Sequence, residues 1–83
     1  MAKEDKRFAR IANNPKDVKF RDFVAAIEAC GFEFIGQTGS HQRYRHHEHR
    51  RALLNIQPRG GKAKPFQVRQ FLALVAEYNL TDV

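Results

Sequence analysis

Two stretches of this chain repeat apolar side chains at the spacing of an α-helix, one in its first half and one near its end. The i, i+3, i+4, i+7 pattern places these residues on one face of an amphipathic helix. The first stripe contains Phe20, Phe23, Val24 and Ile27, and the second contains Val68, Phe71, Leu72 and Val75. Gly31 is placed to end the first helix and Pro65 to begin the second. Each helix must bury its stripe, so the segment between them has to supply the covering surface.

The intervening segment predicts three short strands joined by turns, because it is rich in aromatic and branched residues. The predicted strands cover residues 32–37, about 41–46, and 51–57. Thr38-Gly39-Ser40 supplies the first turn, and His47-Glu48-His49 lies in the second. Pro58 stops the third strand, and residues 59–64 are expected to form a flexible cationic loop. The predicted order is therefore helix, three-stranded antiparallel meander, helix.

These elements predict one small domain. The economical arrangement packs both helices on one face of the sheet and leaves the other face open, which is an α+β fold of the double-stranded-RNA-binding-domain type. We expect this domain to cover residues 17–83, with its first helix starting between Asp17 and Phe20. Residues 1–16 form a charged N-terminal extension, either a short leading helix or a loosely held arm. With 83 residues, the chain has a hydrophobic core too small to contain a deep pocket. We therefore expect a shallow surface site and no cofactor.

Positive charge is concentrated in the middle of the chain. The sequence has 15 Lys and Arg against 9 Asp and Glu, a formal net charge of +6. Between Phe34 and Ala76 the single acidic residue is Glu48. The cations of this region are Arg43, Arg45, Arg50, Arg51, Arg59, Lys62, Lys64 and Arg69. This concentration predicts a polyanionic partner, with nucleic acid favoured over an anionic membrane, and an ordinary solvated charged face as the alternative.

Cysteine content and hydropathy predict a soluble cytoplasmic protein. Cys30 is the single cysteine, so no internal disulfide can form and a reducing compartment is expected. Its position at the end of an apolar helix indicates a packing role rather than a reactive thiol. The N-terminus lacks an apolar secretory core, and no run of about 18 apolar residues occurs. We therefore expect no membrane partner.

The turn Gly39-Ser40-His41 delivers a histidine to the first position of an arginine-bearing strand. Strand alternation groups His41, Arg43 and Arg45 on one face, and Gln42, Tyr44 and His46 on the other. Tyr44 is the most apolar of the six, so its face is expected to meet the helices. The face that carries His41 is therefore expected to meet solvent.

A solvent-facing histidine beside cations suits acid–base chemistry on a phosphodiester. Histidine changes its charge near neutral pH, so His41 is the candidate to take the proton from a ribose 2′-hydroxyl. The candidate phosphate contacts are Arg43, Arg45, Lys62 and Lys64. Such a cleavage needs no metal and leaves a cyclic phosphate and a 5′-hydroxyl. The leaving 5′-oxygen also needs an acid, and the sequence leaves Lys62, Lys64 and His46 as candidates.

Several of these residues also have a structural interpretation. A lone strand histidine such as His41 is more often a surface or hydrogen-bonded structural residue than a catalyst. The cluster at residues 46–49, with three histidines and Glu48, is a weak candidate for zinc, because structural zinc sites draw ligands from two well-spaced pairs. Phe32, Phe34 and Tyr44 can stack on bases, although on so small a sheet such rings are more often core.

With these residues placed, the sequence resembles the HicA family of toxins, the RNA-cleaving halves of bacterial toxin–antitoxin pairs. The resemblance covers about residues 15–80. It is carried by Gly31-Phe32, by Gly39-Ser40-His41 with Tyr44 three residues on, by Leu53-Leu54-Asn55-Ile56-Gln57, and by residues 61–71 with their Lys64-Pro65 step. The position of the Gly-Ser-His turn between the first helix and the meander makes the match specific.

The resemblance implies a double-stranded-RNA-binding-like fold and a metal-independent endoribonuclease activity on messenger RNA, that of an mRNA interferase. It also implies catalysis through His41 and a HicB-type antitoxin that binds and covers the site. One departure concerns the end of the third strand, where many members have a Pro-His pair and this chain has Gln57-Pro58-Arg59. This chain therefore either lacks the function of that histidine or performs it with another residue. The alternative function is a non-catalytic double-stranded-RNA-binding module, and a scaffold for an acidic protein partner is a weaker third.

Overall fold

The computed structural model describes residues 2–80 of the chain. Its helices are α1 (Ala2–Asn13), α2 (Phe20–Ala29) and α3 (Pro65–Tyr78). Its strands are β1 (Phe32–Thr38), β2 (His41–His46), β3 (Leu53–Ile56), β4 (Pro58–Arg59) and β5 (Lys62–Ala63). The predicted extension and domain also include residue 1 and residues 81–83, which lie outside the described residues.

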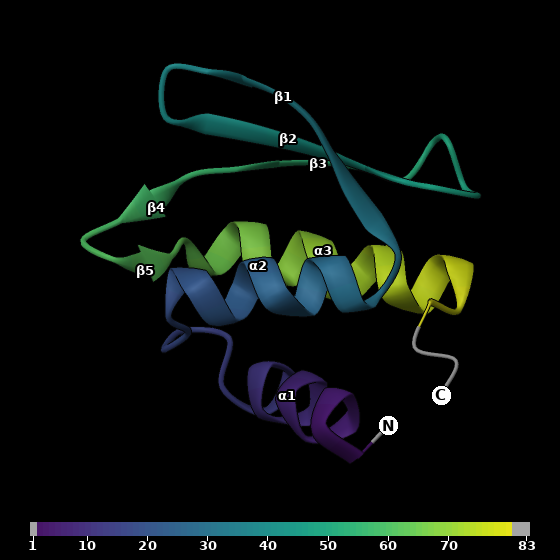
Figure 1. Cartoon of the computed structure of the whole chain (residues 1–83). Coiled ribbons are helices and arrows are strands. Elements are labelled where there is room, and N and C mark those ends of the chain that lie inside the picture. The colour runs from purple at the N-terminus through teal and green to yellow at the C-terminus, as the bar shows by residue number, and fades with distance from the viewer. Residues whose placement is uncertain (1, 81–83) are drawn as a thin grey trace.

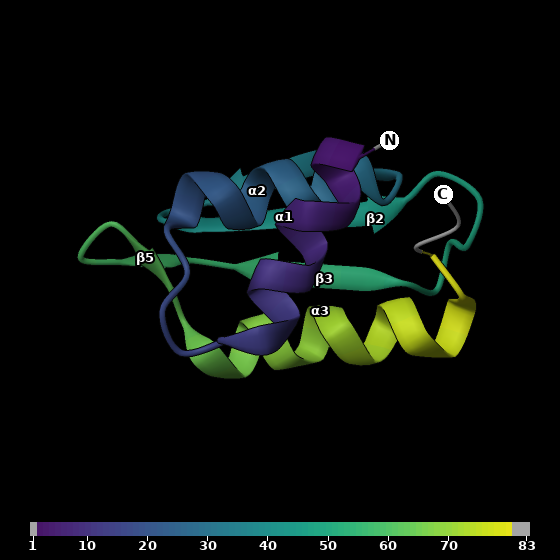
Figure 2. The same cartoon turned by 90° about the horizontal axis from the view of Figure 1, so that it is seen from below.

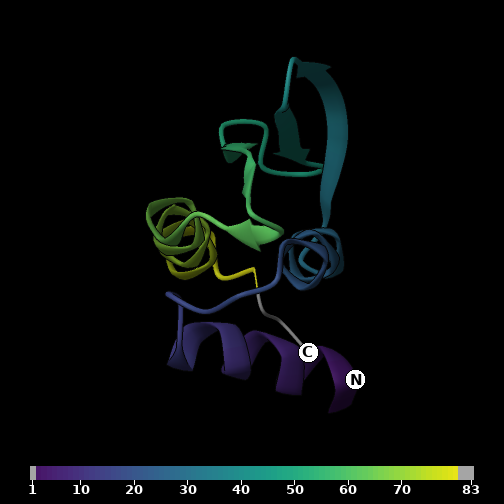
Figure 3. The ribbon, with the colours of Figure 1, turned by 90° about the vertical axis from the view of Figure 1, so that its left-hand side faces the viewer.

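The first three strands form an antiparallel sheet in the order β1-β2-β3. Tyr44 in the middle strand pairs with Phe34 on one side and with Leu54 on the other. Helices α2 and α3 lie side by side under one face of this sheet, and the opposite face is turned away from them (Figure 1, Figure 3). This arrangement confirms the predicted α+β fold, which is like that of a double-stranded-RNA-binding domain.

Phe71 of α3 lies at the centre of the core between the sheet and the helices. Its ring makes edge contacts with Phe23 of α2 at a centroid distance of 5.7 Å and with Phe32 of β1 at 6.1 Å. The largest fully buried side chains are Phe23, Ile27, Ile56, Val68 and Phe71. Burial of each side chain of this kind contributes about 1.5–3 kcal/mol. The two predicted apolar stripes therefore hold both helices against the sheet.

The two helices under the sheet begin and end at residues with suitable backbone chemistry. α2 begins at Phe20 after Lys19, which makes no side-chain cap bond, and Asp22 places a negative charge in the first turn. The chain leaves α2 through Gly31, whose φ of 96° is readily adopted by glycine. α3 begins with Pro65, which has no N–H to leave unpaired at the first helical position.

Residues 59–64 are a hairpin and not the predicted flexible loop. β4 pairs with β5 through Pro58 and Ala63, and the two connecting glycines have φ values of 60° and 80°. Positive φ at both central residues is the requirement of a tight I′ turn, whose twist matches that of the flanking strands. The hairpin is tied to the α1–α2 linker, because Ala63 donates its backbone N–H to the Val18 carbonyl at 2.8 Å. The predicted third strand is also shorter than expected and covers Leu53–Ile56.

The charged N-terminal extension contains a leading helix, the first of the two predicted alternatives. α1 crosses beneath both α2 and α3, on the side of the helices away from the sheet (Figure 2). Ile11 is only 2% exposed and joins the main core, and the Phe8 ring lies 6.2 Å from that of Phe71. The described part of the molecule therefore has three layers: the sheet, the pair α2 and α3, and α1. Separately, no helix among the described residues combines the length and apolarity needed to cross a bilayer.

Candidate active site on the open face of the sheet

The β1–β2 turn presents His41 to solvent. Thr38 pairs with His41 across the turn, so Gly39 and Ser40 are its two connecting residues. Gly39 has a φ of 61°, a conformation that residues with a Cβ adopt only with strain. Gln37 donates a side-chain hydrogen bond to the Gly39 carbonyl at 2.8 Å, which holds the turn closed. His41 is exposed, as the sequence predicted.

The side chains of β2 alternate between solvent and core in the predicted order. His41 and Arg43 are exposed and Arg45 is half-buried, whereas Tyr44 is 3% exposed and His46 is 5% exposed. The structure therefore brings the candidate histidine and both candidate arginines to the same face of one strand. This face is the one turned away from the helices.

Asn55 fixes the imidazole of His41 from the neighbouring strand. His41 Nδ1 lies 3.3 Å from Asn55 Oδ1, and Asn55 pairs with Arg43 across the β2–β3 ladder. An amide oxygen accepts, so Nδ1 carries the proton in this arrangement and Nε2 has a free lone pair. Nε2 is therefore the atom that can act as a base. Asn55 was not predicted as a site residue, although a polar residue between Leu54 and Ile56 is a signal that could have identified it.

Gly36 makes room for the guanidinium of Arg43. A Cβ at position 36 would lie 2.8 Å from Arg43 Nη2, so the arginine side chain lies over the glycine on the edge strand. Gly36 also pairs with Arg43 in the β1–β2 ladder, directly after the β-bulge. The Arg43 side chain therefore extends over β1, on the same face of the sheet as His41.

A chain of hydrogen bonds joins the Gly-Ser-His turn to the start of α3. Gln57 donates its Nε2 to Ser40 Oγ at 2.9 Å and accepts at Oε1 from Lys64 Nζ at 2.7 Å. The backbone N–H of Gln57 is held in turn by Oε1 of Gln67, which is 4% exposed, at 2.9 Å. Ser40 and Lys64, both predicted site residues, are thus brought together by Gln57. The linking role of Gln57 could not be read from the sequence.

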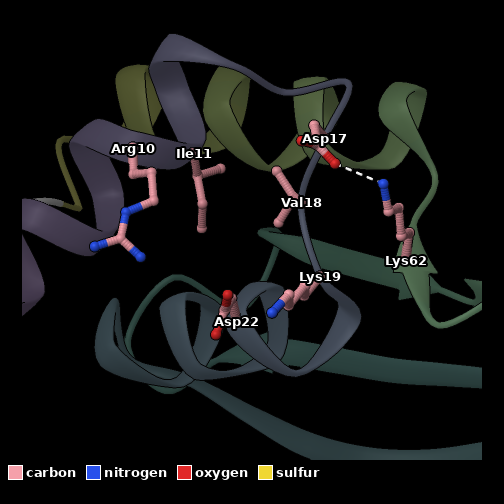
Figure 4. Close-up of a pocket in the computed structure, with 7 residues that line it drawn as sticks. All are labelled: Arg10, Ile11, Asp17, Val18, Lys19, Asp22 and Lys62. Atoms are coloured by element: carbon pink, nitrogen blue, oxygen red, sulfur yellow. Dashed lines mark hydrogen bonds and ion pairs between the residues drawn. The ribbon is translucent and has the colours of Figure 1, made fainter.

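Lys62 is directed away from this network. Its ammonium donates to Asp17 Oδ1 at 2.6 Å, and this hydrogen bond together with the lysine charge lowers the pKa of Asp17. The pair lies beside a cavity of about 280 Å³ between α1, the linker and α2 (Figure 4). The cavity is lined by Arg10, Ile11, Asp17, Val18, Lys19, Asp22 and Lys62. It contains cations and carboxylates together, so its charge does not favour an anion.

His46 is a structural residue, which corrects its inclusion among the candidate acids. Its Nε2–H donates to the Cys30 carbonyl at 2.9 Å, and its Nδ1 accepts from the backbone N–H groups of Glu48 at 3.1 Å and His49 at 3.2 Å. Burial lowers the pKa of His46, which favours the neutral ring. Both ring nitrogens are committed to the backbone, so neither is available to a leaving group or a metal ion. No group of three or more metal-ligating side chains is assembled within the described residues.

Two other sequence interpretations are resolved by burial. Phe32 is 2% exposed and belongs to the core with Tyr44, so neither ring is open to a base, whereas Phe34 is 53% exposed. Burial raises the pKa of Cys30 to about 11, which keeps its thiol protonated and fits the predicted packing role.

The model of a known protein family matches the part of the chain that builds this site. The family is described as the HicA toxin of bacterial toxin–antitoxin systems, and the match covers residues 20–75. The chain belongs to the HicA toxin family. The matched region begins at the first residue of α2 and contains the sheet, the hairpin and most of α3, but not α1. Comparisons with curated proteins and with solved structures give no match to this HicA chain.

Proposed function

We propose that this HicA protein is an endoribonuclease that cleaves messenger RNA without a metal ion, with His41 as its central acid–base residue. The observation that carries the proposal is the exposed imidazole whose Nδ1 is held by Asn55, on the face that also presents Arg43. The contact with the amide oxygen favours the ring form in which Nδ1 carries the proton, and Nε2 of the exposed side chain is then the nitrogen that can act as a base. The messenger RNA substrate places this activity in the cytoplasm.

The chemistry follows from the position of that lone pair. Nε2 of His41 takes the proton of a ribose 2′-hydroxyl, and the 2′-oxygen attacks the adjacent phosphorus. The bond from phosphorus to the 5′-oxygen breaks, which leaves a 2′,3′-cyclic phosphate and a 5′-hydroxyl. Arg43, Arg45 and Lys64 supply positive charge for the phosphate groups. Lys62 adds less, because the carboxylate of Asp17 already offsets its charge.

A HicB-type antitoxin is the proposed partner. Membership of the HicA toxin family implies an antitoxin partner, which supports this proposal. The open face of the sheet presents Arg43 and Arg45 beside the exposed His41, and the chain from Phe34 to Ala76 has a single acidic residue. We therefore expect the antitoxin to cover this face with acidic groups. Bound there, it would exclude RNA from His41.

The test compares the loss of two histidines in purified protein. His41→Ala should abolish cleavage of an unstructured RNA and growth arrest in cells, while the circular-dichroism spectrum stays unchanged. His47→Ala removes another exposed histidine, directly after the end of β2, and should retain cleavage. Product RNA should carry a 2′,3′-cyclic phosphate, and EDTA should not change the rate.

Three results would contradict the proposal. Retained cleavage by His41→Ala would remove the histidine from the mechanism, and restoration of activity by zinc or magnesium after EDTA would introduce a metal. If the wild-type protein binds RNA but forms no product, the alternative of a non-catalytic RNA-binding module holds. Binding by such a module should weaken by about 0.7–0.9 log units per phosphate contact for each tenfold rise in salt.

A further inference from the structure

The proposed reaction needs a proton for the leaving 5′-oxygen, and the structure distinguishes the three candidate donors. His46 is buried with both ring nitrogens bonded to the backbone, and Lys62 is paired with Asp17 on the linker. Lys64 instead reaches the Gly-Ser-His turn through Gln57. We infer that Lys64 is the general acid that protonates the leaving 5′-oxygen and that Gln57 is its positioning residue; this inference rests on the proposed ribonuclease function.

The hydrogen-bond chain limits how far Lys64 can lie from the turn. The chain consists of two hydrogen bonds, 2.7 Å from Lys64 Nζ to Gln57 Oε1 and 2.9 Å from Gln57 Nε2 to Ser40 Oγ. With the amide width added, the ammonium lies at most about 8 Å from the Ser40 hydroxyl. An acid and a base on opposite sides of one phosphate lie within roughly 10 Å of each other, because each makes a hydrogen bond of about 2.6–3.2 Å. The hydrogen-bond chain therefore holds the Lys64 ammonium close to the residue that precedes His41, which is where an acid partner of His41 is needed.

Lys64 is held in place by its backbone as well as by its side chain. It occupies the N-cap position of α3, where its carbonyl accepts from the N–H groups of Gln67 at 2.9 Å and Val68 at 3.1 Å. Its side chain is half-buried, which restricts the flexible stem. A lysine with this support loses less conformational entropy when it engages a substrate than a freely mobile one.

The location of Lys64 is not explained by helix stability. The N-terminus of a helix carries a partial positive charge, so a cation at this position is unfavourable for α3. Lys64 also makes no side-chain cap bond to the helix. Replacing it with a neutral residue should therefore leave the fold intact, which makes the residue suitable for a kinetic test.

Two proton transfers accompany the cleavage. His41 Nε2 receives the 2′-proton as the bond from the 2′-oxygen to phosphorus forms. The bond from phosphorus to the 5′-oxygen breaks, and that oxygen receives one of the three ammonium protons of Lys64. The products are the cyclic phosphate, the 5′-hydroxyl, an imidazolium and a neutral amine. The imidazolium then releases its proton to solvent, and the amine regains one from it.

The experiment replaces the leaving 5′-oxygen by sulfur, because a thiolate leaves without being protonated. Cleavage of this RNA and of the all-oxygen RNA is measured for the wild type, Lys64→Met and His41→Ala. Lys64→Met should lower the rate on the oxygen substrate by about 100-fold or more, as expected for loss of an acid. On the sulfur substrate its loss should be far smaller, limited to the charge that Lys64 contributes to phosphate binding, whereas His41→Ala stays slow on both.

Further variants serve as controls for charge and position. Lys16→Met removes an exposed lysine from the α1–α2 linker and should leave both rates unchanged. Gln57→Leu should lower the cleavage rate on the all-oxygen RNA by roughly tenfold, because it only displaces the acid. On the sulfur substrate this variant should also regain its rate. Lys64→Arg should be as slow as Lys64→Met on oxygen, because a guanidinium does not give up its proton.

The outcomes separate this inference from the function on which it rests. Equal loss on both substrates in Lys64→Met would show that Lys64 only binds phosphate, and full activity of Lys64→Arg would show that its charge alone matters. Either result overturns the inference while leaving the ribonuclease function intact. If the wild type cleaves neither substrate, the proposed function itself is wrong.

Discussion

At the scale of single residues, the two histidines at the ends of β2 differ because the strand turns them to opposite faces. His41 and His46 are separated by an odd number of positions, so alternation points one to solvent and the other to the helices. The first is exposed with one ring nitrogen free, and the second bonds backbone groups with both. The same residue type is therefore the proposed catalyst at the start of β2 and a structural, hydrogen-bonded residue at its end.

Buried His46 should make stability depend on pH. Burial lowers the pKa of His46 in the folded chain below the value of about 6.5 that an unfolded chain retains. Below that pH the unfolded chain binds more protons than the folded one. The contribution of His46 to the free energy of unfolding should therefore be complete above about pH 6.5 and should decrease as the pH is lowered. Urea unfolding at pH 7.5 and pH 5.5 measures this loss.

The control for that prediction is His46→Gln, which cannot titrate. The variant should be less stable at pH 7.5 by about 1–3 kcal/mol, because it leaves buried backbone groups unpaired. Its stability should then fall less between the two pH values than that of the wild type. An equal fall in both proteins would show that other groups cause the dependence.

Gly36 should control the position of Arg43 without affecting the fold. A Cβ at position 36 would meet the end of the flexible arginine side chain at 2.8 Å, and that end can move away. Gly36→Ala should therefore change the free energy of unfolding by less than about 1 kcal/mol, since alanine is also less costly than glycine in a strand. If Arg43 binds phosphate from this position, RNA affinity should fall by about tenfold.

A double-mutant cycle links that loss to the arginine. Arg43→Met should weaken RNA binding to a similar degree, and adding Gly36→Ala to it should have no further effect. Additive losses in the double variant would mean that Gly36 acts on RNA binding by another route. Binding is measured by fluorescence anisotropy of a labelled RNA at one fixed salt concentration, because affinity depends strongly on salt.

At the scale of elements, the β4–β5 hairpin depends on its two glycines. Gly60→Asn should change the free energy of unfolding by less than about 0.5 kcal/mol, because asparagine is favoured at the first position of a I′ turn. Gly61→Val should lower the free energy of unfolding by about 1–2 kcal/mol, because the φ of 80° at position 61 is strained for a residue with a Cβ. Chemical denaturation compares the two variants, and equal stability would show that the turn is not held in this geometry.

The sequence predicted those elements whose signals are local, and it failed where contacts are distant in the chain. The apolar stripes placed α2 and α3, and alternation in β2 placed His41 on the open face, as the structure confirms. The two glycines at 60 and 61 suggested flexibility, but their positive φ values close a hairpin. The bonds from Lys62 to Asp17 and from Gln57 to Ser40 join distant segments, so no local pattern reveals them.

At the scale of the whole molecule, the three layers separate the proposed chemistry from α1. His41 is exposed on the open face of the sheet. The helices α2 and α3 lie behind the sheet, and α1 lies behind those two helices (Figure 3). The match to the HicA family includes the first two layers and excludes the third. Stability and RNA cleavage should therefore respond differently to changes in α1.

Ile11 is the residue that tests this separation. Because it is 2% exposed within the core, Ile11→Ala should lower the free energy of unfolding by about 2–4 kcal/mol. Ala12→Ser, at an exposed position on the same helix, should change it by less than about 0.5 kcal/mol. Under conditions where both variants remain folded, their RNA-cleavage rates should equal that of the wild type. If Ile11→Ala lowers the free energy of unfolding no more than Ala12→Ser does, α1 is only loosely held. If folded Ile11→Ala cleaves RNA more slowly than the wild type, the third layer influences the site.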